Sequence, residues 1–292
     1  MQYQNRLPPE GINTPGRHPL KEFIRLAFFA VVALVSLGLL LNYAGGQVGG
    51  LLPFKAERWL ANKIHTGMIE SGQESPFHQD PVDTPLLEYL QDLSNEVQEA
   101  LGIEQPMSIS LHYSQEDTVN AYATIGGHVY LFKGLLQELP HENALAMLMA
   151  HEYSHVQLRH TAKGIGSGLA VALTTVVLPG DTSFDNPFFS LTSQLTSTHF
   201  SRDMEADADL NGLIAVEKLY GHVNGADDLF KLFMRQRGEA SENNWEAFFS
   251  THPLDQDRID ALANFAVKND FATMGEIVAL PENFKRLSLI HI

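Results

Sequence analysis

An unbroken apolar run near the N-terminus sets the first limit on how this chain can fold. Residues 26–41 read LAFFAVVALVSLGLLL, and no charged side chain occurs between Arg25 and Lys55. With the next three residues included, the run approaches the ~20 residues that a helix needs to cross the hydrocarbon core of a bilayer. We therefore expect a transmembrane anchor at residues 26–44, which contacts membrane lipid.

The charges on either side of this run predict its orientation. Residues 1–25 contain four Lys or Arg and two Glu, whereas the first basic residue after the run is Lys55. Because basic residues stay preferentially on the cytoplasmic side, residues 1–25 are expected to be cytoplasmic and the chain after the anchor to be exported. The sequence thus predicts a single-pass protein of a bacterial-type inner membrane, with its domain on the periplasmic side.

Two other interpretations of the apolar run remain open. A cleaved signal peptide would release the domain into the periplasm, and Ala44 and Gly46 supply small residues at a cleavage-like spacing. A buried core helix is the other alternative, although such a run beside a basic flank is unusual inside a soluble domain. The anchor and the signal peptide both place the remaining chain outside the cytoplasm.

The composition excludes several classes of partner and ligand. The formal net charge is −16, so the surface repels phosphate backbones and we expect no nucleic-acid partner. The chain has no cysteine, which excludes a disulfide scaffold, thiolate zinc ligands and a cysteine nucleophile. Any metal must therefore be bound by imidazole and carboxylate groups.

The chain after the anchor divides into a connecting region and one large domain. Residues 45–85 are expected to form a linker with a juxtamembrane helix. Residues 42–54 are rich in glycine and predict a flexible exit from the membrane, whereas residues 55–70 predict a helix and residues 71–85 a loop. Residues 86–292 are expected to form the domain.

Helical patterns dominate the expected domain. Apolar residues three and four apart predict an amphipathic helix over residues 86–101, and residues 120–132 have two β-rich pieces around a Gly-Gly hairpin turn. A long buried helix is expected after Pro140, and a further helix over residues 201–219. Residues 164–178 predict a core helix, with a second membrane span as the alternative. The fold class is therefore α+β and mainly α-helical, with a small β-sheet.

The pentad H-E-x-x-H lies at residues 151–155, inside the predicted long helix. Four residues are just over one helical turn, so His151 and His155 project from one face and can bind a single ion. Glu152 lies beside that face, within reach of a water at the metal. A purely structural role is the alternative, because a pentad alone also arises by chance.

A zinc site for hydrolysis needs a third protein ligand and an open position for water. The extended pattern H-E-x-x-H-x-x-G-x-x-H is excluded, because Leu158 and Thr161 occupy its glycine and third histidine positions. Glu205, in a later helix, can bind the metal while Asp209, one turn further on, accepts the outer N–H of a ligand histidine. An acidic, solvated helix face is the alternative for that segment.

Two motifs together make the chain similar to a known family. The pattern S-R-x-x-E-x-x-A-D-x-x-G is complete in residues 201–212, downstream of the pentad. The pair of motifs resembles the HtpX-like and CAAX-prenyl-protease-like zinc metallopeptidases, peptidase family M-48, which are gluzincins. The matches extend to His252-Pro253, to Arg258-Ile259 and to N-A-Y-A at residues 120–123. The resemblance covers about residues 86–262, and the short N-terminal anchor departs from members with several spans.

The residues and the resemblance together imply a zincin-like domain that binds one Zn2+ ion. The expected roles are zinc ligands His151, His155 and Glu205, catalytic base Glu152, and supporting residues Asp209 and Arg202. His252 is expected to donate to the developing oxyanion or to cap the zinc, with a turn-fixing role as the alternative. The strand Asn120, Ala121, Tyr122 and Ala123 is expected to pair with an extended substrate.

These residues predict a zinc-dependent endopeptidase that acts on protein or peptide substrates. The family and the expected location indicate that these are membrane or envelope proteins, cleaved in quality control or processing. A different class of function is the alternative, in which a membrane-tethered, chaperone-like binding module holds a mainly structural zinc.

Overall fold

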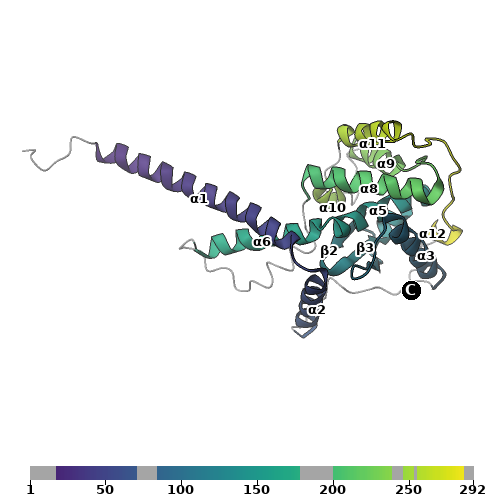
Figure 1. Ribbon diagram of the computed structural model, residues 1–292, viewed down its shortest axis with the longest axis horizontal. Coiled ribbons are helices and arrows are strands. Elements are labelled where there is room, and N and C mark those ends of the chain that lie inside the picture. Colours follow the sequence, from purple (N-terminus) through teal and green to yellow (C-terminus); the bar gives the residue numbers. More distant parts are fainter. Residues whose placement is uncertain (1–17, 71–83, 178–199, 239–245, 253–254, 286–292) are drawn as a thin grey trace, which may run out of the picture.

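The computed structural model describes residues 18–70, 84–177, 200–238, 246–252 and 255–285 (Figure 1). Its elements, in chain order, are α1 (Pro19–Gly50), α2 (Phe54–Glu70), α3 (Thr84–Leu101), β1 (Ser110–Ser114), β2 (Ala121–Thr124), η1 (Ile125–Gly127), β3 (His128–Phe132), α4 (Lys133–Glu138), α5 (Glu142–Gln157), α6 (His160–Val177), α8 (Arg202–Tyr220), α9 (Asp228–Gly238), α10 (Glu246–Thr251), α11 (Gln256–Lys268) and α12 (Glu282–Lys285). The predicted fold class, mainly helical α+β with a small sheet, is confirmed. Residues 179–198, whose polar and aromatic sequence predicts a loop, lie outside the described residues.

The small sheet has three strands in the order β1-β3-β2. β1 runs parallel to β3, and β2 runs antiparallel to β3 with Ala121 opposite Leu131. The turn between β2 and β3 passes through Gly126 and Gly127, whose φ angles of 75° and 81° suit glycine because it lacks a Cβ. The predicted hairpin is therefore confirmed, and β2 is left at the edge of the sheet.

The central element of the domain is α5. Every residue from Asn143 to Val156 is buried, since α3, α8 and β2 pack around the helix. His141 caps the first turn by accepting a hydrogen bond from the amide of Ala144 (3.1 Å). The pentad lies in the last two turns of this helix, so its side chains are held in a rigid, water-poor part of the protein.

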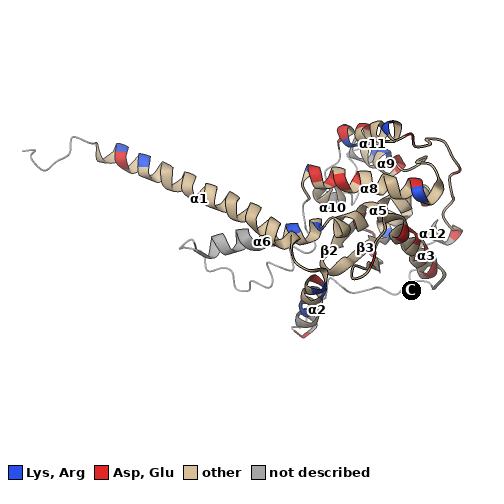
Figure 2. Ribbon diagram, viewed as in Figure 1, with Lys and Arg blue, Asp and Glu red and all other residues tan. Residues whose placement is uncertain are grey.

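The N-terminal helix α1 is longer than the predicted anchor. It has 32 residues and, by length and composition, is able to cross a membrane. Figure 2 shows charged residues only near its free end, with uncharged residues along the rest. Residues 45–50 were expected to be a flexible linker, but the structure places them in the helix, because their glycines pack closely on α6.

The juxtamembrane helix α2 is attached to the domain rather than hanging free. Arg58 donates to the carbonyl oxygen and the hydroxyl of Ser108, at 2.9 Å and 2.7 Å, and to the carbonyl of Gly126 at the hairpin turn. Buried Glu57 forms an ion pair with Arg159, which lies between α5 and α6. The connection between α1 and the domain is therefore structured through α2.

Candidate metal centre

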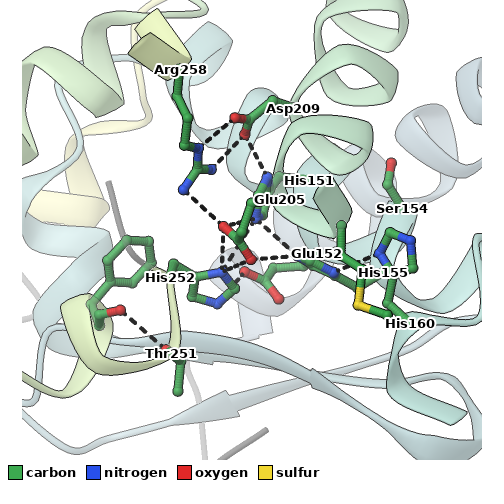
Figure 3. A network of polar contacts seen from close by, with 12 residues as sticks. His151, Glu152, Ser154, His155, His160, Glu205, Asp209, Thr251, His252 and Arg258 are labelled. Carbon is green, nitrogen blue, oxygen red and sulfur yellow. Dashed lines mark hydrogen bonds and ion pairs between the residues drawn. The ribbon is translucent and has the colours of Figure 1, made fainter. Parts of the chain in front are cut away.

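Three segments of the chain bring polar side chains to one buried point of the domain (Figure 3). α5 supplies His151, Glu152 and His155, and α8 supplies Glu205 from its first turn. His252 follows α10 directly. All five side chains are at most 4% exposed. Such a group of buried titratable residues is costly unless charges are balanced within it.

The ligand atoms of His151, His155, Glu205 and His252 all lie within 4.8 Å of one another. Nε2 of His151 is 3.1 Å from Nε2 of His155 and 3.3 Å from Nδ1 of His252. Oε1 of Glu205 is 3.4 Å from Nε2 of His155 and 3.1 Å from Nδ1 of His252. The four residues therefore converge on one small volume.

These separations fit a tetrahedral zinc ion. Bonds of about 2.0–2.1 Å from zinc to nitrogen and oxygen place tetrahedral ligand atoms about 3.3–3.4 Å apart. The observed nitrogen–nitrogen and nitrogen–oxygen separations lie close to that value. Two imidazole nitrogens facing each other at 3.1 Å also repel unless a proton or a cation lies between them. The residues present thus fit the predicted zinc.

The outer nitrogens of both pentad histidines have buried partners. Nδ1 of His151 lies 2.9 Å from Oδ1 of Asp209, and Nδ1 of His155 lies 3.1 Å from Nδ1 of His160. Such partners fix the ring orientation and the tautomer of a metal-binding histidine. The contact of Asp209 is the one that the sequence predicted, whereas His160 was not assigned a role. Phe200 completes the support by stacking on His155, with ring centroids 3.7 Å apart.

Arg258 of α11 links Asp209 and Glu205, two of the acidic residues of α8. Its Nε and one terminal nitrogen donate to Asp209 at 2.7 Å and 2.8 Å, and its other terminal nitrogen lies 2.9 Å from Glu205. This forked geometry suits a guanidinium, which presents several donors in one plane. Arg258 is 9% exposed, so these charges interact in a low-dielectric environment.

The structure places Arg202 away from this network, which differs from the prediction. Its side chain is 85% exposed and lies 3.8 Å from Asp255. Seven residues separate Arg202 from Asp209 on α8, a rise of about 10 Å, so one arginine side chain cannot bridge them easily. Arg258, from a separate helix, is the arginine that contacts Asp209 and Glu205.

Glu152 lies beside the four ligand atoms but is not one of them. Complete burial raises the pKa of its carboxyl, while the nearby His252 and His151 act to lower it. Nε2 of His252 lies 3.4 Å from Oε1 of Glu152. Burial alone would lower the pKa of His252, but the carboxylates of Glu205 and Glu152 raise it to about 9. Without an ion, a proton on His252 thus helps to balance the carboxylates.

The predicted substrate strand borders this site. Asn120 directly precedes β2, and Ala121 and Ala123 are buried while Tyr122 is half-buried. β2 packs against α5, and the backbone amide of Ala123 lies close enough to Glu152 to lower its pKa. The edge strand therefore lies next to the carboxylate that the sequence singled out.

A buried helix that carries H-E-x-x-H, paired with a second helix that carries a glutamate and bordered by an edge strand, defines a zincin-like metallopeptidase domain. The model of Peptidase family M48 matches residues 87–266, more than half of the chain. The chain belongs to peptidase family M48, and the family resemblance seen in its motifs is confirmed.

Curated relatives support the same assignment. The mitochondrial metalloendopeptidase OMA1 of Schizosaccharomyces pombe is 33% identical over 151 residues, which are 51% of this chain and 44% of that protein. A putative beta-barrel assembly-enhancing protease of Vibrio cholerae is 26% identical over 226 residues, 73% of this chain and 45% of that protein. The chain thus spans less than half the length of these relatives.

Proposed function

We propose that this protein is a membrane-anchored, zinc-dependent endopeptidase that cleaves membrane or envelope proteins in quality control or processing. The observation that carries the proposal is the position of Glu152, buried beside a set of four ligand atoms that fits zinc. The names of the curated relatives, a metalloendopeptidase and a protease, support the same activity. Its test is zinc-dependent cleavage of an unfolded protein such as casein by the purified full-length chain in detergent.

His151, His155 and Glu205 would hold the zinc, with Asp209 and His160 orienting the two imidazoles. When bound, zinc supplies a Lewis acid that polarises a peptide carbonyl and makes water more acidic. Glu152 takes the proton of the attacking water on a carboxylate oxygen and then delivers it to the leaving amine. Burial suits the second step, because a raised pKa favours the protonated form of Glu152 that donates to the amine.

The edge strand β2 gives the site a means of holding an extended peptide. An extended substrate can add to the edge through backbone hydrogen bonds, which are independent of side-chain identity. Asn120, Ala121, Tyr122 and Ala123 would form this docking edge, and its nearness to Glu152 places a bound peptide bond beside the base. This arrangement favours an endopeptidase that recognises mainly the backbone.

We further propose that α1 anchors the protein in a bacterial-type inner membrane, with the domain on the periplasmic side. Support comes from the exposure of its apolar side chains, from Phe23 to Val48, and from the basic residues that precede them. Secretion after cleavage of the apolar segment is the alternative. N-terminal sequencing of the membrane-bound protein distinguishes the two, because only the anchor retains residues 26–44.

One observation favours the second candidate function, a binding module with structural zinc. His252 supplies a fourth ligand atom, and zinc sites with four protein ligands are typically structural, whereas catalytic sites keep one position open. We propose instead that His252 caps the site at rest and leaves when substrate enters. Its place beyond α10, outside the two ligand helices, allows it to move without disturbing them.

Replacing His252 by alanine is expected to raise cleavage of casein, because it opens the fourth position while three ligands remain. Phe248→Ala removes a ring that stacks on His252, with 5.0 Å between centroids, and should also raise the rate of casein cleavage. Initial cleavage rates at matched zinc content measure both effects. A fall of about 10²–10³-fold for His252→Ala would instead assign His252 to the oxyanion.

Replacing His160 by alanine is expected to weaken zinc binding by about 10–100-fold, because His155 loses the partner that orients its ring. Competition with a fluorescent chelator measures the zinc dissociation constant. Thr161→Ala is the matched control, since Thr161 is also buried but its hydroxyl has no hydrogen-bond partner among the residues described. Equal zinc affinity of the wild type and His160→Ala would show that His160 only fills space.

A further inference from the structure

The helix that follows the pentad, α6, lies along the N-terminal helix α1. Figure 1 shows the two helices projecting from the body in the same direction. The hydroxyl of Ser167 donates to the backbone carbonyl of Asn42 (3.0 Å). Residues 164–178 were expected to form a core helix of the domain, but beyond its first turns α6 extends away from the domain beside α1. Its neighbour is thus the proposed anchor.

The two helices approach each other at backbone distance. A Cβ atom added to Gly49 would lie 2.2 Å from the carbonyl oxygen of Ala162, and one added to Gly166 would lie 2.1 Å from that of Gly45. Only glycine permits this approach. Small residues at such crossings are characteristic of helix pairs inside membranes, where close van der Waals packing holds helices together. The pair is therefore a fixed unit rather than two independent helices.

The contacts define the direction of α6. Gly49 faces Ala162 and Asn42 faces Ser167, so the helices are antiparallel and α6 runs back toward the start of α1. From Ser167 to Val177 the helix advances about 15 Å, at 1.5 Å per residue. That advance brings its second half level with the apolar run of α1.

The sequence of α6 suits that environment. No charged residue occurs from Gly164 to Gly180, and residues 169–177 read LAVALTTVV. Lys163 lies at the start of this stretch, and its aliphatic stem packs beside Gly50 near the end of α1. A lysine at this position can keep its ammonium at the lipid headgroups while its stem covers apolar surface.

We propose that α6 is a second membrane-embedded helix, which enters the bilayer beside α1 from the side of the domain and ends near the middle of the bilayer. The inference rests on the proposed function of α1 as an anchor. The hydrocarbon core is about 30 Å thick, and α6 extends about half that distance past Ser167. Lipid acyl chains surround the faces of α6 that α1 does not cover.

The placement also sets the position of the metal centre. His160, which contacts His155, is the first residue of α6 and lies one turn before Lys163. With Lys163 at the headgroups, the metal centre lies next to the membrane surface. Peptide bonds just outside the bilayer are then the bonds that reach the site most directly.

Depth-dependent quenching tests this inference on the full-length chain. The protein has no cysteine, so single cysteines can carry an environment-sensitive fluorophore without interference. One cysteine at a time is placed at residues 169, 170, 171 and 172 of α6, which cover all faces of one turn. Val35→Cys in α1 is the control for a position inside the bilayer. Gln91→Cys, at an exposed position on α3, is the control for a position in water. The protein is reconstituted in phosphatidylcholine–phosphatidylglycerol vesicles that contain nitroxide-labelled lipids.

The α6 positions that face away from α1 are expected to be quenched as strongly as Val35, while Gln91 stays unquenched. Quenching at Val35 without quenching at any of the four α6 positions would overturn the inference and leave the anchor intact. Absence of quenching at Val35 would overturn the anchor and the inference together. Bound zinc, measured on each labelled protein, shows that the domain is folded in every case.

Discussion

Substitution of Glu152 by glutamine is expected to reduce casein cleavage by about 10²–10⁴-fold, the contribution typical of a positioned general base. Zinc binding should persist, because Glu152 is not among the four ligand atoms. The fold should also persist, since a neutral amide of the same shape replaces a buried carboxyl whose pKa burial already raises. Initial rates and zinc content per chain measure the two effects on the same preparation.

Glu99→Gln is the matched control, because Glu99 is an exposed glutamate on α3, outside the metal centre. It should cleave casein at the rate of the wild type. If Glu152→Gln also cleaves at that rate with zinc bound, the endopeptidase mechanism proposed for Glu152 is wrong. Binding of unfolded clients without cleavage, by the wild type as well as the variant, would favour the binding module.

Substitution of Arg258 by methionine is expected to lower the free energy of unfolding by about 3–5 kcal/mol, the cost of leaving buried charges without their partner. Asp209 and Glu205 would lose contacts of 2.7–2.9 Å in a buried site. Chemical denaturation of the domain, with zinc and with a chelator, measures the loss. The loss should be larger in the chelator, because bound zinc still neutralises Glu205.

Arg202→Met is the matched control, since it removes the same type of charge from α8 at a position 85% exposed. Exposed pairs of this kind contribute at most about 1 kcal/mol. Equal destabilisation by the two variants would contradict the assignment of Arg258 as the partner of the buried carboxylates. The two variants therefore compare the loss of unfolding free energy at Arg202, to which the sequence assigned a supporting role, with the loss at Arg258, which contacts the buried carboxylates.

Local patterns predicted most of the fold. The amphipathic spacing of residues 86–101 and the Gly-Gly turn correspond to α3 and to the β2–β3 hairpin. The prediction of a flexible linker was wrong at residues 45–50, which are helical although glycine has a low helix propensity. Packing on α6 outweighs that preference, and the contact depends on residues more than a hundred positions away.

The site shows the same division between local and distant information. The pentad and the spacing of Glu205 and Asp209 reflect the helical turn, so these residues were found from their intervals. Arg258 appeared in the sequence only as a family match beside Ile259, and its contacts with Asp209 and Glu205 are tertiary, so no interval in the chain encodes its role. His160 could have been found from the sequence, because it lies only five residues after His155 and is therefore close to the pentad. The extended zinc motif directed attention to Thr161 instead.

The forked contact of Arg258 has a consequence for the charge of the whole buried set. With neutral imidazoles, three carboxylates (Glu152, Glu205 and Asp209) and one guanidinium leave two negative charges deep in the protein. A divalent ion brings this set to electroneutrality, whereas sodium or potassium leaves it negative. Loss of the ion therefore draws protons into the site, so release of zinc consumes acid and becomes easier as the surroundings acidify.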